Sequence, residues 1–182
     1  MPEQPQRVIW KSTTASADAK RKKLMHSALR LIACVVLCFA VAALGSWVTR
    51  PQIPTWYATL LKPSWTPPAW LFPVAWNVLY LLMALSLWRL WERSREHVAG
   101  AERAIWLFLA QLALNAAWAP TFFGLHAIWS GLLIIVALAM VLVVTIYAAF
   151  HVDRPAAWML VPYLAWIVYA SSLNAAIAVL NG

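Results

Sequence analysis

Long apolar segments without charge limit the possible fold of this chain more than any other feature. Leu31 to Thr49 contains no charged residue, and a helix needs about 20 mostly apolar residues to cross a hydrocarbon layer roughly 30 Å thick. Of all residues, 64% are hydrophobic and only 11% are charged, unlike soluble domains. The sequence therefore predicts an all-α integral membrane bundle of five transmembrane helices, over residues 31–49, 68–91, 104–122, 127–150 and 156–180.

The N-terminal segment differs in composition from the rest of the chain. Residues 1–28 are polar, show no apolar periodicity and end near the basic run of residues 20–23. Such a segment is typical of a tail that is solvated or contacts lipid headgroups. We predict a disordered basic cytoplasmic tail over residues 1–28 and a transmembrane domain over residues 29–182. A cleavable signal peptide is the alternative for the first apolar segment, because basic residues precede it.

The distribution of positive charge indicates an orientation. The chain has a net charge of +8, and of its 14 Lys and Arg residues only Arg50 and Lys62 fall on the side opposite the N-terminus. Short cytoplasmic loops carry an excess of basic residues in membrane proteins. The pattern therefore favours an N-terminus in the cytoplasm, and it accounts for the charge without a nucleic-acid partner.

The residue sets of common catalytic and metal sites do not occur in the sequence. There is no Ser-His-Asp or Cys-His set, no phosphate-binding glycine loop and no metal-ligand spacing. Cys34 and Cys38 fall inside the first apolar segment and are interpreted as small core residues. We expect no metal and no cofactor, and axial ligation of a haem iron is disfavoured because all histidines lie in tails or near helix ends: His26, His97, His126 and His151.

Aromatic rings and amides share one face on three of the predicted helices. At about 100° per residue, these faces carry Trp76, Tyr80, Met83 and Leu87 on the second helix, Gln111, Asn115 and Trp118 on the third, and Tyr163, Trp166, Ala170, Asn174 and Asn181 on the fifth. Amides at membrane depth turn inward. They either join the helices by hydrogen bonds or orient a ligand in a cavity lined by rings. The nearby tryptophans favour the cavity, with a flat apolar ligand.

Two further segments are open to interpretation. Residues 50–68 are rich in proline, which predicts a partly ordered loop that carries Trp56, Tyr57 and Trp65 over the cavity. Small residues on the other side of the third helix allow close approach of another helix, either in a dimer or within one bundle: Ala110, Ala113 and Ala117.

The motifs of the loop and of three helices resemble the TspO/MBR family, the tryptophan-rich sensory proteins related to the mitochondrial translocator protein. The resemblance covers roughly residues 30–182 and rests on motifs in order: Trp56-Tyr57, Lys62-Pro63-Ser64-Trp65-Thr66-Pro67-Pro68, Phe72, Trp76, Leu79-Tyr80, Gln111-Leu112-x-Leu114-Asn115-x-x-Trp118, Phe122-Phe123, Pro162-Tyr163-x-x-Trp166 and Leu173-Asn174.

This resemblance implies a five-helix bundle, commonly a homodimer, with a ligand pocket beneath the first loop. It implies a receptor or sensor in the lipid bilayer of a bacterial cell, which binds porphyrins and is linked to tetrapyrrole metabolism or stress. Carried over by position, the pocket is lined by Tyr57, Trp65, Trp76, Gln111, Asn115, Trp118, Trp166, Ala170 and Asn174.

Two other functions remain open at this point. Light-dependent porphyrin breakdown would use Trp76 and Trp166 as the photochemical residues, and a transporter would move porphyrins or sterols. No Lys or Arg follows Tyr163 and Tyr169, so the sterol motif of the mitochondrial relatives is absent.

Overall fold

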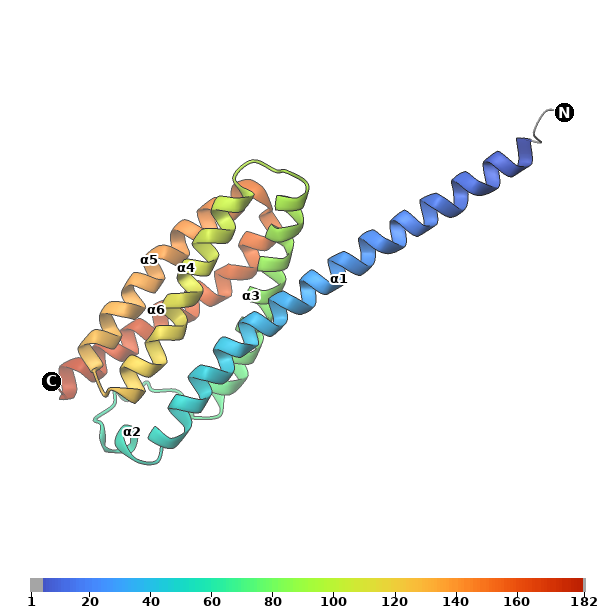
Figure 1. Ribbon diagram of the computed structural model, residues 1–182. Helices are drawn as coiled ribbons and strands as arrows, with labels where there is room; N and C mark the ends of the chain where they lie inside the picture. Colours follow the sequence, from blue (N-terminus) through green and yellow to red (C-terminus); the bar gives the residue numbers. More distant parts are fainter. Residues whose placement is uncertain (1–4, 182) are drawn as a thin grey trace.

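The first helix extends far beyond the rest of the bundle. The computed structural model describes residues 5–181, and in it α1 runs without interruption over Pro5–Gln52. In Figure 1 its N-terminal half projects away from the other helices. Residues 5–28, for which the sequence predicts disorder, are thus helical, and the helix does not begin at Leu31. No proline or glycine lies between Pro5 and Gly45, and the many Ala, Lys and Leu residues have high helix propensity, which explains the continuation.

Five helices in the described part of the chain are long and apolar enough to cross a membrane. They are α1, α3 (Leu71–Arg95), α4 (Ala101–Ala119), α5 (Ile128–Val152) and α6 (Arg154–Asn181). A π-helical turn, η1 (Pro120–Gly124), extends α4, and a short helix, α2 (Trp56–Thr59), lies between α1 and α3. The predicted all-α bundle is confirmed, and the chain is an integral membrane protein.

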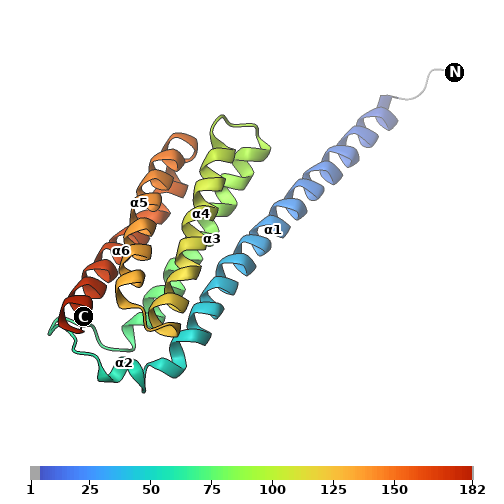
Figure 2. The ribbon, with the colours of Figure 1, turned by 60° about the vertical axis from the view of Figure 1, so that its left-hand side comes forward.

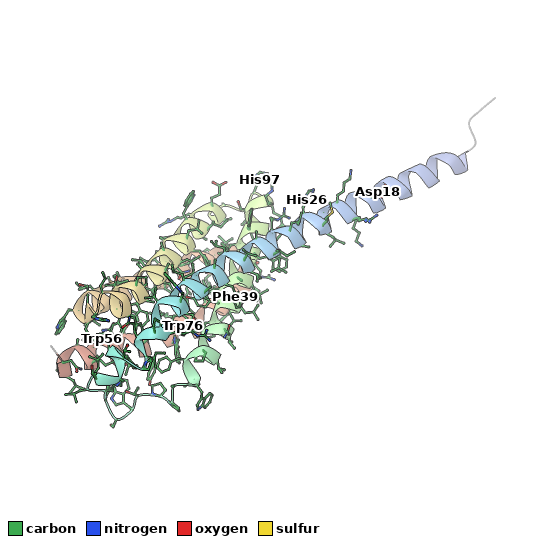
Figure 3. The ribbon with its side chains drawn as sticks, turned by 60° about the horizontal axis from the view of Figure 1, so that its bottom comes forward. Asp18, His26, Phe39, Trp56, Trp76 and His97 are labelled. Atoms are coloured by element: carbon green, nitrogen blue, oxygen red, sulfur yellow. The ribbon has the colours of Figure 1, made fainter. Side chains whose placement is uncertain are left out.

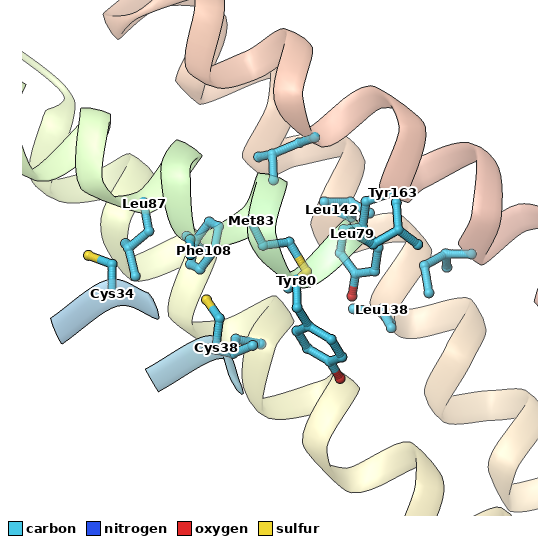
Figure 4. Close-up of a cluster of buried hydrophobic side chains, with 14 of the residues drawn as sticks. Cys34, Cys38, Leu79, Tyr80, Met83, Leu87, Phe108, Leu138, Leu142 and Tyr163 are labelled. Carbon is cyan, nitrogen blue, oxygen red and sulfur yellow. The ribbon is translucent and has the colours of Figure 1, made fainter. Parts of the chain in front are cut away.

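The helices pack around a core to which all five spans contribute buried side chains. α3 contacts α1, α4 and α6, while α5 packs mainly against α4 and α6. Figure 2 shows α1 at the edge of the bundle. Figure 4 shows Cys34 and Cys38 of α1 facing Met83 and Phe108 in this core. Both cysteines are at most 1% exposed, which confirms their interpretation as core residues.

The proline-rich connection between α1 and α3 is tied to the end of α6. Prolines lack the N–H donor that a regular helix needs, and only α2 is helical within this connection. The Asn181 side chain binds both polar groups of Leu61: the Leu61 N–H donates to Asn181 Oδ1 at 2.8 Å, and Asn181 Nδ2 donates to the Leu61 carbonyl at 2.9 Å. The Tyr169 hydroxyl donates to the Trp65 carbonyl at 3.1 Å. The loop is therefore ordered by side chains of α6.

Ion pairs fasten the helices at the other end of the bundle. The Asp153 carboxylate, between α5 and α6, accepts hydrogen bonds from Arg89 Nε at 2.7 Å and Arg93 Nε at 2.8 Å. It also accepts a hydrogen bond from the Ala156 N–H at 2.9 Å and so caps the first turn of α6. Burial of Asp153 would raise its pKa, but these hydrogen bonds outweigh the burial and lower the pKa to about 2.

Candidate functional site

The amide of Asn115 joins three helices near the centre of the bundle. The Tyr80 hydroxyl of α3 donates to Asn115 Oδ1, and Asn115 Nδ2 of α4 donates to the Tyr163 hydroxyl of α6 at 2.9 Å. All three side chains are at most 6% exposed. Buried polar groups need such partners. Asn115 therefore has the hydrogen bonds expected of a residue that holds the bundle together.

Gln111 lies one turn before Asn115 on α4 and differs from it in one respect. Its side chain is fully buried, and neither the amide oxygen nor the amide nitrogen has a hydrogen-bond partner among the residues that the structure describes. The indole Nε1 of Trp166 is also buried without a partner. Leaving such a group unpaired costs about 1–3 kcal/mol. The interior therefore contains donors and an acceptor that a bound molecule could use.

Trp76 and Trp166 belong to one continuous cluster of rings. Trp76 stacks on Tyr80 with ring centroids 5.4 Å apart, and it meets Tyr163 edge-on at 6.3 Å. Trp166 lies 6.4 Å from Trp76 at an interplanar angle of 82°, and 5.9 Å from Phe72. Figure 3 labels Trp76 among the packed helices, and the ring packs against the main core. These rings form a continuous aromatic cluster that includes Tyr80 and Tyr163, the two hydrogen-bond partners of Asn115.

Trp118 and Asn174 belong to a second group, nearer the α1–α3 loop. Trp118 Nε1 donates to Asn174 Oδ1 at 3.2 Å, and Asn174 Nδ2 donates to the Ile128 carbonyl at 3.1 Å. The Trp118 ring stacks on Phe122 at 5.4 Å, and Tyr57 lies 5.5 Å from Phe123. The polar atoms of this group are paired, so it resembles a structural cluster beneath the loop.

The turn η1 brings both phenylalanines of that group inside. Pro120 has no N–H, and the Leu125 N–H reaches back five residues to the Pro120 carbonyl at 2.9 Å, the pattern of a π-helix. Phe122 and Phe123 are both buried as a result. A Cβ at Gly131 would lie 3.1 Å from two carbons of Phe122, so a larger residue there would have to displace Phe122 by a few tenths of an ångström.

The remaining predicted ligand-binding residues lie at the rim or beside the first group. Trp65 is 46% exposed, and its ring lies 5.8 Å from that of Tyr169. Ala170 is half-buried, one turn after Trp166. Lys62 Nζ donates to the Leu60 carbonyl at 3.0 Å and lies 4.7 Å from the centre of the Tyr57 ring. Lys62 is therefore already engaged within the loop.

The structure also places three residues in the site that the sequence analysis did not predict to line the pocket. Tyr80 and Tyr163 supply the hydroxyls on either side of Asn115, and Phe72 packs against Trp166. The sequence could have indicated these residues, because they lie on the same helical faces as Trp76 and Trp166. Packing within one bundle was one of the two alternatives for the small residues of α4. The structure does not support that alternative, because Ala110, Ala113 and Ala117 are exposed.

Comparison with known proteins gives a consistent family. The TspO/MBR family model matches residues 34–180. The tryptophan-rich protein TspO of Chlorobaculum tepidum is 40% identical over 157 residues, which cover 84% of this chain and 96% of that protein. The tryptophan-rich sensory protein of Cereibacter sphaeroides is 36% identical over 137 residues, with 75% and 82% coverage. Human translocator protein is 36% identical over 119 residues, with 65% and 70% coverage. The chain therefore belongs to the TspO/MBR family of integral membrane proteins.

Proposed function

We propose that this protein is a membrane receptor or sensor that binds porphyrin-type tetrapyrroles between α3, α4 and α6, beneath the α1–α3 loop. The observation that carries the proposal is the unpaired Gln111 amide together with the unpaired indole N–H of Trp166. A porphyrin offers both a large flat apolar surface and polar nitrogens. Aromatic rings bind the first and amides orient the second.

The ring geometry suggests how the ligand is admitted. Trp76 and Trp166 meet edge to face at 6.4 Å and 82°, so a flat macrocycle cannot lie between them as they stand. Trp166 has no hydrogen bond to lose when it moves, whereas Trp118 is bonded to Asn174. We infer that Trp166 turns and the macrocycle stacks on Trp76, with Gln111 and Asn115 orienting it.

Charged and small residues at the ends and on the surface of the bundle support proposals about ligand contacts, membrane orientation and oligomeric state. A propionate of the ligand would compete with the Leu60 carbonyl for Lys62 or meet the exposed Arg50 at the loop. The concentration of basic residues at the other end supports a cytoplasmic N-terminus, here in a bacterial cell membrane. The exposed alanine face of α4 supports a homodimer, because small residues allow close helix packing in lipid.

A second function follows from the same ring contacts. The Trp76 ring contacts the rings of Tyr80, Tyr163 and Trp166. A photoexcited porphyrin on Trp76 could take an electron from this cluster, and porphyrin breakdown would follow if oxygen then captured the radicals. The protein would in that case be an enzyme whose photochemical residues are Trp76 and Trp166.

One titration separates the two functions. Detergent-solubilised protein is titrated with protoporphyrin IX in the dark while tryptophan fluorescence is followed, and the porphyrin absorbance is then followed under illumination. A sensor gives saturable quenching and stable absorbance. Saturable quenching followed by protein-dependent bleaching to a defined product supports the enzyme, and quenching that does not saturate contradicts tetrapyrrole binding altogether.

A further inference from the structure

A groove lies at the end of the bundle opposite the α1–α3 loop. It is hollowed between the projecting part of α1 and the C-terminal end of α3, and its volume is about 510 Å³. Its lining includes Lys23, His26 and Arg30 of α1 and Trp91, Glu92 and Arg95 of α3. Figure 3 labels His26 where α1 leaves the bundle. The groove therefore combines basic side chains with one large aromatic ring.

Both carboxylates of the groove are already neutralised by protein donors. Glu92 accepts hydrogen bonds from Arg30 Nε at 2.8 Å, from Arg30 Nη2 at 3.0 Å and from Ser27 Oγ at 2.9 Å. Glu96, which follows α3 and also lines the groove, accepts Arg93 Nη1 at 2.9 Å. Among the side chains that the structure describes, neither Lys23 nor Arg95 forms an ion pair. The groove therefore presents uncompensated positive charge.

The groove also lies at the depth of lipid headgroups. Arg30 immediately precedes the uncharged stretch that begins at Leu31. With a rise of about 1.5 Å per residue, Lys23 lies roughly 10 Å beyond Arg30 along α1. The headgroup region extends about 5–8 Å beyond each face of the hydrocarbon layer. His26 and Arg30 therefore fall within it, and the long side chain of Lys23 reaches it.

Apolar surface adjoins the basic lining. Trp91, which is 37% exposed on α3, contributes a large aromatic ring to the lining itself. Tryptophan is enriched at this depth because its ring is amphipathic. An occupant that is anionic at one end and apolar at the other would contact both the basic side chains and the aromatic ring of the lining.

We propose that this groove binds the phosphate-bearing headgroup of an anionic membrane lipid. Lys23 and Arg95 would approach the phosphate, while Trp91 would pack against the glycerol and the first part of an acyl chain. The Arg30–Glu92 pair holds α1 and α3 at the spacing that forms the groove. Basic pockets between transmembrane helices bind anionic headgroups in this way. A soluble phosphate ester shares the headgroup chemistry, but it would leave the apolar surface unused.

The test is thermal unfolding of the full-length protein in detergent with increasing short-chain phosphatidylglycerol. Phosphatidylcholine and glycerol phosphate serve as parallel ligands. We expect saturable stabilisation by phosphatidylglycerol alone. In the double variant Lys23→Gln and Arg95→Gln the half-saturating lipid concentration should rise roughly 30-fold, which corresponds to about 2 kcal/mol at a factor of ten per 1.4 kcal/mol.

A matched double variant controls for overall charge. Arg21 lies about 200° from Lys23 around α1, and Arg103 is exposed on α4, outside this groove. Arg21→Gln with Arg103→Gln removes the same charge and should leave lipid binding unchanged. Equal losses in the two double variants would overturn the proposal, as would equal stabilisation by phosphatidylcholine. Equal stabilisation by glycerol phosphate would instead assign the groove to a soluble phosphate.

Discussion

Trp76 and Trp166 lie edge to face in the interior of the bundle, with ring centroids 6.4 Å apart and planes at 82°. The arrangement is a favourable aromatic contact, and it closes the space that a flat ligand would occupy. The two rings are therefore in direct contact in this structure, and the proposed stacking of a macrocycle on Trp76 requires one of them to move.

Replacing both tryptophans by phenylalanine should separate binding from photochemistry. Phenylalanine keeps a ring at each position, so Trp76→Phe with Trp166→Phe should weaken protoporphyrin IX binding by less than about tenfold, or 1.4 kcal/mol. Any protein-dependent bleaching under illumination should fall steeply, because phenylalanine is much harder to oxidise. Absorbance titration in the dark and in the light measures both. Unchanged bleaching would exclude these residues as the electron donors.

Asn115 should contribute strongly to stability. Replacing Asn115 by alanine leaves two buried tyrosine hydroxyls, those of Tyr80 and Tyr163, without a partner. We expect the free energy of unfolding in detergent to fall by about 2 kcal/mol or more. Thr145→Val is the control, since the buried Thr145 hydroxyl bonds only to Val141 of its own helix. A loss no larger than that of the control would contradict the bridging role.

Asp153 should make stability depend on acid pH. Its pKa is about 2 against an ordinary value of 3.8, so the native state holds the carboxylate more strongly in its charged form. The resulting stabilisation, on the order of 2 kcal/mol, is complete above about pH 4 and is lost as the pH falls toward about 2.

Comparison with Asp153→Asn isolates this contribution from that of other carboxylates. The variant should be less stable at neutral pH, and the difference in unfolding temperature between the two proteins should shrink between about pH 4 and pH 2. A difference that stays constant across this range would show that the pairing with Arg89 and Arg93 does not stabilise the fold.

Asn181 should control the order of the loop over the site. Asn181→Ala removes both hydrogen bonds to Leu61. At about 1 kcal/mol for each bond, amide hydrogen exchange around Leu61 should accelerate roughly tenfold or more. Asn77→Ala is the control, because Asn77 bonds only to Pro73 of its own helix. Exchange that does not change would mean that other contacts, such as Tyr169 with Trp65, hold the loop.

The sequence predicts the helices well because hydrophobic length is a property of each segment alone. It misplaces the start of α1 because helix propensity, and not only apolarity, continues the helix through residues 5–30. It likewise ends α4 in a regular helix, whereas Pro120 shifts the hydrogen bonding to the π-helical η1.

The candidate site is less predictable because its chemistry depends on partners from other helices. Gln111 and Asn115 have the same type of side chain and lie one turn apart on one face. Only the tertiary structure shows that Asn115 bonds to Tyr80 and Tyr163, while the Gln111 amide has no hydrogen-bond partner among the described residues. Periodicity predicts which residues face inward, but it does not predict which of them are paired.

The most direct test of the central claim compares wild type with Gln111→Leu in two measurements: protoporphyrin IX affinity and unfolding temperature without ligand. If the Gln111 amide forms a hydrogen bond to the bound porphyrin, the leucine variant should bind protoporphyrin IX about tenfold more weakly or worse, because that hydrogen bond is lost. The unliganded variant should be at least as stable as wild type, because an unpaired buried amide is removed. Wild-type affinity combined with a lower unfolding temperature would contradict the account and would make Gln111 a structural residue.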